Sequence, residues 1–224
     1  MLDSFYRAFV AEQRYLLYLD GLKVTILVSV IAILIGVALG TILALMRLTA
    51  EQKGKSTLLS KIAYVYIDII RGTPTLTQLM IMYFVILKGQ NGLLVGSLTF
   101  GLNSAAYVAE IIRAGIQSVD VGQMEAARSL GIPYWKAMQK VVLPQAIRTM
   151  IPSIINQFII TLKDTSILSV IGFPELVNAA QNVIAINFKS FQVWFLVGLM
   201  YLIVITILSK IAKALERRMN RGRK

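Results

Sequence analysis

The sequence of 224 residues contains no cysteine and no histidine, and each absence removes a class of function. Without cysteine the chain can form no disulfide, no thiolate nucleophile and no cysteine metal site. Without histidine it lacks the usual general base and the commonest metal ligand. We therefore expect no enzymatic activity, no metal site and no cofactor held by this chain.

Charged residues are also scarce, at 15%, whereas 57% of the residues are hydrophobic. A chain of this length with so apolar a composition is predicted to span a membrane. The net charge of +12 lies beside the apolar runs, so the expected partner is anionic membrane lipid and not nucleic acid. Residues 1–20 do not resemble a cleavable signal peptide and predict an amphipathic segment at the membrane interface.

Five stretches are long enough to cross a bilayer, which takes about 20 residues per helix. They are residues 22–46, 62–87, 97–118, 146–170 and 191–211. The second is interrupted at Gly72-Thr73-Pro74, because proline removes a helical hydrogen bond. The predicted fold class is all-α, a polytopic membrane protein with five transmembrane helices in a domain of residues 21–215, followed by a basic tail at 216–224.

Lysine and arginine are divided unevenly between the two sides of these predicted spans. Residues 47–61, 113–148 and 210–224 hold four, five and seven basic residues, and the loops and N-terminal segment of the other side hold five. Because basic residues concentrate in cytoplasmic loops, the N-terminus is predicted outside and the C-terminus inside.

The polar stretch between the third and fourth spans has a pattern of its own. Glu125, Ala126 and Ala127 favour a helix, and Gly131 suits the left-handed residue that ends one. Pro133 then suits the first turn of another helix. The apolar residues around this corner are Leu130, Ile132, Tyr134 and Trp135. The pattern predicts a helix–glycine–helix corner that docks in a groove on a partner, although an ordinary helical hairpin between spans would share some of these features.

The spacing of this stretch resembles the EAA loop in the membrane subunits of ABC importers. The matching residues are Glu125-Ala126-Ala127, Gly131, Val141, Leu143 and Pro144, with valine at 141 where the family more often has isoleucine. Two further motifs resemble the polar amino acid branch of that family, which includes glutamine, arginine and histidine permeases. They are Arg71-Gly72-Thr73-Pro74 and Ala106-Tyr107-x-Ala109-Glu110-x-x-Arg113-x-Gly115. The resemblance covers roughly residues 20 to 215.

This resemblance implies the permease subunit of an importer that moves a polar or charged L-amino acid inward across the cytoplasmic membrane. It implies a second permease copy, with a homodimer expected, and an external substrate-binding protein. It also implies a dimer of ATPase subunits that binds ATP and Mg and carries out the catalysis. The residues it assigns to ATPase coupling are Glu125, Ala126, Ala127, Leu130, Gly131, Tyr134 and Trp135.

Ionisable side chains within the spans require a role, because charges are costly in hydrocarbon. Counted along their helices, Glu110 and Arg71 lie at similar depths, about 12 and 13 Å from the inner end. Glu110 would either bind the amino or cationic end of a substrate, or form a structural ion pair with Arg71 or Arg113. The candidate substrate-binding residues are Arg71, Asn103, Tyr107, Glu110, Gln157, Thr161 and Asp164.

A second class of function remains open at this stage. In a stand-alone secondary transporter or channel, Glu110 and Asp164 would serve as proton or ion sites. Many secondary transporters contain inverted repeats, and five spans without such a repeat argue against this alternative.

Overall fold

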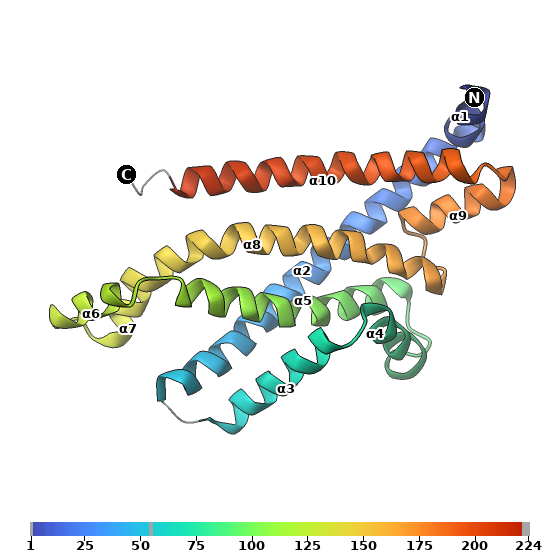
Figure 1. Ribbon diagram of the computed structural model, residues 1–224. Helices are drawn as coiled ribbons and strands as arrows, with labels where there is room; N and C mark the ends of the chain where they lie inside the picture. Colours follow the sequence, from blue (N-terminus) through green and yellow to red (C-terminus); the bar gives the residue numbers. More distant parts are fainter. Residues whose placement is uncertain (1, 54–55, 221–224) are drawn as a thin grey trace.

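Helices account for all the regular structure in the parts of the chain that the structure describes (Figure 1). This computed structural model describes residues 2–53 and 56–220, and side chains are described for 5–50 and 56–219. The elements are α1 (Leu2–Phe9), η1 (Ala11–Gln13), α2 (Arg14–Lys53), α3 (Leu58–Gly72), α4 (Thr75–Ile81), η2 (Met82–Ile86), α5 (Gly92–Gln117), α6 (Val121–Ser129), α7 (Tyr134–Ala137), η3 (Met138–Val142), α8 (Leu143–Asp164), η4 (Thr165–Ile171), α9 (Leu176–Asn187) and α10 (Ser190–Asn220). The all-α prediction is confirmed.

The predicted spans each have a helical counterpart. Within residues 2–53 and 56–220, four stretches are long and apolar enough to cross a membrane unaided, namely Phe5–Ala50, Gly92–Gln117, Tyr134–Ile171 and Ser190–Met219. Leu58–Gly72 and Thr75–Ile86 pass the same test together, are bent by 108° at the break between them, and count as a fifth span when the bent pair is taken as one.

Two predicted boundaries lie within helices. The N-terminal segment is divided between α1 and the start of α2, with left-handed backbone at Glu12 and Gln13 (φ 52° and 56°) turning the chain between them. Residues 14–20 continue into the first span because no proline interrupts them. The basic tail begins within α10, and its residues 221–224, like loop residues 54–55, lie outside the described residues.

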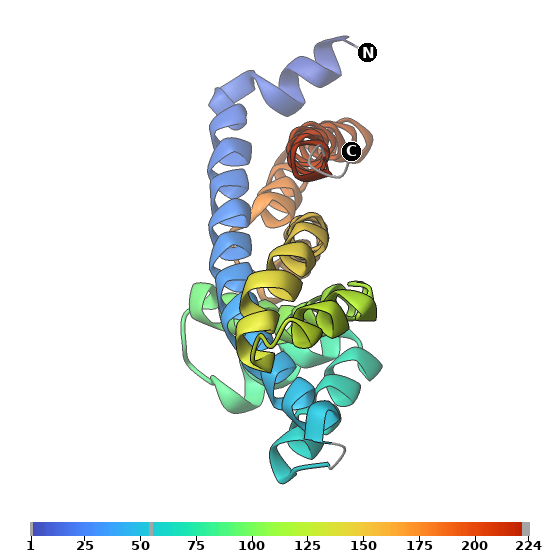
Figure 2. The ribbon, with the colours of Figure 1, turned by 90° about the vertical axis from the view of Figure 1, so that its left-hand side faces the viewer.

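The longest helix, α2, is the one along which the others are arranged. Its 40 residues extend for about 60 Å at 1.5 Å per residue, about twice the thickness of the hydrocarbon core. It contacts α3, α5, α8 and α9. In Figure 2, α10, α9 and α8 lie one after another to the right of it, whereas α5 crosses it.

Small residues set the closest of these contacts, between α2 and α5. A Cβ atom added at Gly36 would lie 2.7 Å from the Cβ of Ser104, and one at Gly40 would lie 2.8 Å from the carbonyl oxygen of Ala105. Neither space accepts a methyl group without separating the helices. The four-residue spacing of these glycines therefore serves close helix packing, as it does in many membrane proteins.

The bend between α3 and α4 frees backbone carbonyl groups, and one side chain satisfies them. The amide nitrogen of Gln78 donates to the carbonyl oxygens of Ile70 at 2.8 Å and Thr73 at 3.2 Å. Asn103 of α5 in turn donates to the Gln78 side-chain oxygen at 3.0 Å. A broken helix is tolerated in a bilayer only when neighbours satisfy its backbone, and Gln78, itself held by Asn103, does so.

The connections between helices gather at two opposite ends of the molecule (Figure 1). One end carries the end of α2, the start of α3, α6, α7 and the C-terminal end of α10, and we call it the basic end because the described parts of the three lysine- and arginine-rich segments lie toward it. The other carries α1 and α9 and is called the α9 end. That the basic end faces the cytoplasm stays a prediction.

A buried carboxylate begins α9. Glu175 is fully buried, and its two oxygens accept hydrogen bonds from the backbone N–H groups of Val177 and Asn178 at 2.9 and 2.8 Å. The hydroxyl of Thr25 on α2 accepts from the backbone N–H of Leu176 at 3.2 Å. Burial raises the pKa of the Glu175 carboxyl to about 7, although the hydrogen bonds to its charged form oppose that rise.

Candidate substrate cavity and coupling surface

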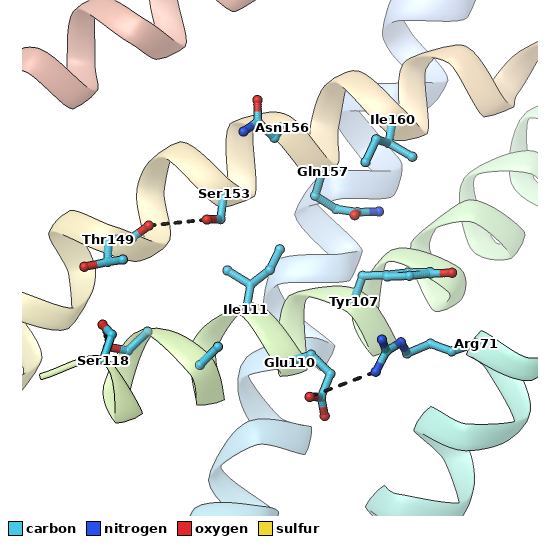
Figure 3. Close-up of a pocket in the computed structure, with 12 residues that line it drawn as sticks. Arg71, Tyr107, Glu110, Ile111, Ser118, Thr149, Ser153, Asn156, Gln157 and Ile160 are labelled. Atoms are coloured by element: carbon cyan, nitrogen blue, oxygen red, sulfur yellow. Dashed lines mark hydrogen bonds and ion pairs between the residues drawn. The ribbon is translucent and has the colours of Figure 1, made fainter.

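An open cavity lies between α3, α5 and α8 (Figure 3). Its volume of about 630 Å³ falls in the ~300–1,000 Å³ range of small-molecule sites. The lining consists of Arg71, Tyr107, Glu110, Ile111, Ala114, Gly115, Ser118, Thr149, Ser153, Asn156, Gln157 and Ile160. The charged side chains come from α3 and α5, and the uncharged polar ones come mainly from α8.

Three guanidinium groups surround one carboxylate at the charged side of the cavity. Glu110 forms an ion pair with Arg47 of α2, and its other oxygen accepts from Arg113 at 2.9 Å. Arg71 lies at 4.0 Å, the longest of the three pairings. Both pairings considered from the sequence are thus present, together with a third that was not. Three positive charges and one negative charge leave this cluster with an excess of positive charge.

The three arginines differ in their surroundings. The Arg47 side chain is only 9% exposed and stacks on the Tyr64 ring, 4.1 Å from its centre. The Arg71 side chain is 45% exposed and lies 5.5 Å from the centre of the Tyr107 ring. Such cation–π contacts fix the planes of the guanidinium groups. Arg47 is therefore a buried structural partner of Glu110, whereas Arg71 is accessible from the cavity.

The structure brings four of the seven predicted substrate residues together and separates the other three. Arg71, Tyr107, Glu110 and Gln157 line the cavity. The remaining three lie elsewhere: Asn103 supports the α3–α4 bend through Gln78, the Thr161 hydroxyl hydrogen-bonds that of Ser104 at 2.8 Å, and Asp164 is the last residue of α8. Their contact with a substrate stays a prediction.

Arg47 was missed from the sequence because it follows the last apolar residues of the first span and was counted as a loop residue. The spacing of Arg47 from the glycines of the same helix could have indicated that it contacts α5. Gly36, Gly40, Ala44 and Arg47 follow one another at intervals of four, four and three residues, which places them on one face of a helix. The two glycines pack against α5, so Arg47, on the same face about three turns after Gly36 and about two turns after Gly40, also meets α5.

The corner that connects α5 to α8 has the predicted helix–glycine–helix form. Gly131 adopts φ 79°, its backbone N–H donates to the carbonyl of Arg128 at 2.9 Å, and Ile132 donates to the carbonyl of Ala127 at 3.2 Å. These two bonds form a Schellman motif, which ends α6. Pro133 is the N-cap of α7. The corner is therefore held by its own backbone.

Side chains at this corner are divided between an inner and an outer face. Ala127 is buried, whereas Glu125 and Ala126 are exposed. Leu130 and Trp135 are 81% and 59% exposed, and the Trp135 ring meets that of Tyr134 edge-on at 5.6 Å. Large apolar side chains grouped on a surface mark an interaction site.

Comparison with known proteins agrees with this architecture. Residues 32–221 match the family described as "Binding-protein-dependent transport system inner membrane component". The chain is 38% identical over 208 residues to the glutamine transport system permease protein GlnP of Escherichia coli K12, covering 91% of this chain and 93% of that one. It is also 38% identical over 209 residues to the arginine transport system permease protein ArtQ of Bacillus subtilis 168, covering 90% and 91%.

Solved structures of amino acid ABC transporters are also similar to this chain. A chain of "an amino acid ABC transporter with histidines" superposes with a TM-score of 0.83 at 38% identity, covering 90% of this chain and 94% of that one. A chain of the MetNI methionine ABC transporter superposes with a TM-score of 0.72 at 17% identity, which shows the shared fold. This chain therefore belongs to the family of inner membrane components of binding-protein-dependent transport systems.

Proposed function

We propose that this chain is a permease subunit of an ABC importer, and that it moves a polar or charged L-amino acid inward across the cytoplasmic membrane. ATP is hydrolysed by separate ATPase subunits that dock on the corner around Gly131. Family membership favours this function over the secondary transporter considered from the sequence.

One observation supports the coupling most directly. The corner with its exposed Leu130 and Trp135 is the segment that joins α5 to α8, and the cavity lies between these same two helices. A partner that moves the corner therefore moves the ends of both helices that form the cavity walls. Because the Schellman motif holds the corner rigid, that displacement reaches the helices without being absorbed in a loop.

The proposal includes three further partners and an orientation. A second copy of the chain completes the membrane unit, an extracytoplasmic binding protein delivers substrate at the α9 end, and lipid surrounds the apolar helices. The basic end faces the cytoplasm, with the N-terminus outside. The lysine and arginine distribution and the placement of the corner at that same end support this orientation.

The test is ATP-dependent uptake into proteoliposomes that contain the chain, its ATPase and its binding protein. We expect accumulation of at least one polar or charged L-amino acid, which stops when ATP is replaced by a non-hydrolysable analogue. Accumulation that persists without the ATPase would overturn the proposal in favour of a secondary transporter.

A further inference from the structure

A buried amide at the cavity has unused hydrogen-bonding capacity. Gln157 of α8 is only 5% exposed, and its side chain makes no hydrogen bond to any residue of the described ranges 5–50 and 56–219. The side-chain amide has two N–H donors and a carbonyl acceptor. Its polar atoms are not among the buried unpaired atoms of the described residues, so they are reached from the open cavity and are free to hydrogen-bond a ligand there.

Across the cavity, Arg71 has unused donors of a different kind. Its guanidinium carries five N–H groups, yet it donates no hydrogen bond to a side chain or backbone group that the structure describes. Its distance of 4.0 Å from Glu110 is too long for a hydrogen bond. A planar fork of this kind, half exposed beside a cavity, matches the geometry of a carboxylate.

The carboxylate of Glu110, in contrast, is already occupied. One oxygen pairs with Arg47, and the other accepts from Nε and Nη2 of Arg113 at 3.3 and 2.9 Å. A cationic substrate group would have to displace one of these arginines. The wall formed by α8 contributes no charge, since its polar members are Thr149, Ser153, Asn156 and Gln157.

Figure 3 shows how the two unused groups are placed. Gln157 extends from α8 and Arg71 extends from α3, both toward α5, and the Tyr107 ring lies between them. A ligand on this ring would meet a guanidinium at one end and an amide at the other. The local charge excess is positive, which favours an anionic group and disfavours a second cation.

We propose that the cavity selects an amino acid with an uncharged, hydrogen-bonding side chain, whose α-carboxylate binds Arg71 and whose side-chain polar group binds Gln157. This inference rests on the proposed function. It moves the substrate contact from Glu110 to Arg71 and leaves Glu110 as the residue that positions the arginines. It also assigns side-chain specificity to α8, because Gln157 on that helix hydrogen-bonds the substrate side chain.

The test measures equilibrium binding to the assembled permease–ATPase complex in lipid nanodiscs, using four ligands. Glutamine is compared with 4-aminobutanamide, which lacks the α-carboxylate, with norvaline, which has a methyl group in place of the amide, and with arginine. Charge-assisted and neutral hydrogen bonds differ in strength, so we expect the wild type to prefer glutamine over 4-aminobutanamide by about ten- to a hundredfold and over norvaline by about three- to tenfold. Arginine should bind more weakly than glutamine.

Two variants assign these preferences to residues. Arg71→Gln should remove the preference that depends on the α-carboxylate and keep the one that depends on the amide, and Gln157→Leu should do the reverse. Gln192→Leu, on α10 and outside the cavity lining, is the matched control and should keep both. Copurification of the ATPase and an unchanged unfolding temperature identify variants that are folded. If Arg71→Gln fails this check, Arg71→Lys keeps the charge but not the planar fork and should weaken the α-carboxylate preference without removing it.

Tighter binding of arginine than of glutamine, or equal binding of glutamine and 4-aminobutanamide by the wild type, overturns the inference without any variant. These outcomes are separable from failure of the proposed function. If the protein takes up an amino acid with ATP but lacks these binding preferences, the importer function is supported and only the proposed selectivity mechanism is overturned. Absence of uptake for every common amino acid removes the importer itself.

Discussion

Replacing Glu110 by glutamine should destabilise the protein, and the cause should be Arg47. The substitution keeps the size of the side chain but removes the charge that three arginines share. The Arg71 and Arg113 side chains are partly exposed and can be solvated, whereas the Arg47 side chain is buried. The variant therefore leaves one buried cation without a counter-ion.

Removing one partner of a buried ion pair costs about 3–5 kcal/mol. The lower end applies here, because Glu110 borders an open cavity and glutamine still accepts a hydrogen bond. For a chain of this size each kcal/mol lowers the unfolding temperature by about 2–4 °C, so a loss of about 3 kcal/mol predicts a fall of about 6–12 °C.

The assay is thermal unfolding of the detergent-solubilised complex, and two double variants identify the responsible arginine. Combining Glu110→Gln with Arg47→Met removes the unpaired buried cation and fills its space. The unfolding temperature of this double variant should therefore recover most of the fall seen in the single variant. Combining Glu110→Gln with Arg71→Gln should recover little, because Arg71 was never stranded. The reasoning fails if the single variant unfolds at the wild-type temperature, or if the Arg71 double variant recovers more than the Arg47 one.

Three further predictions concern the coupling corner, the orientation and the α9 end. Gly131→Asp places a side chain at a residue with φ 79°, which costs about 1–2 kcal/mol locally. The ATPase should therefore copurify poorly, while membrane insertion is unchanged. The control is Gly198→Ala, at a helical glycine with open space around it. Because the chain lacks cysteine, Gln123→Cys should react with an impermeant thiol reagent only from the cytoplasmic side and Gln181→Cys only from outside, and the opposite pattern would invert the topology. The pKa of Glu175 near 7 lies above its ordinary value of 4.5, so the folded state binds the proton more tightly and stability should fall as pH rises from about 5 to 7, by about 1.4 kcal/mol per unit within that window. Glu175→Gln should flatten this dependence, and an unchanged slope in the variant would assign it to another group.

The elements that could be predicted from the sequence are those with a local signal. The spans follow from apolar length, and the corner follows from the Gly131 and Pro133 positions, because left-handed backbone and a fixed proline φ belong to single residues. The bend at Gly72–Pro74 was predicted for the same reason. Its angle of 108° depends on Gln78 and Asn103, which lie on other turns and another helix.

The charged cluster could be predicted only in part, because its members come from three helices. The depths of Glu110 and Arg71 follow from counting residues along each span, so their proximity could be predicted from the sequence. The rotation of α2 about its axis is set by packing on α5, and only that rotation directs Arg47 toward Glu110. The free hydrogen-bonding groups of Gln157 could not be predicted either, because they can be recognised only when the neighbouring residues are known.

The unbroken length of α2 has a mechanical consequence. Thr25 on this helix contacts the start of α9, and Arg47 on the same helix holds Glu110 beside the cavity. These residues are 22 positions apart, which corresponds to about 33 Å of continuous helix. A helix without proline or a break over that distance tilts as a rod and does not bend at a joint. A partner that displaces the start of α9 would thus exert leverage, through α2, on the arginine that pairs with Glu110.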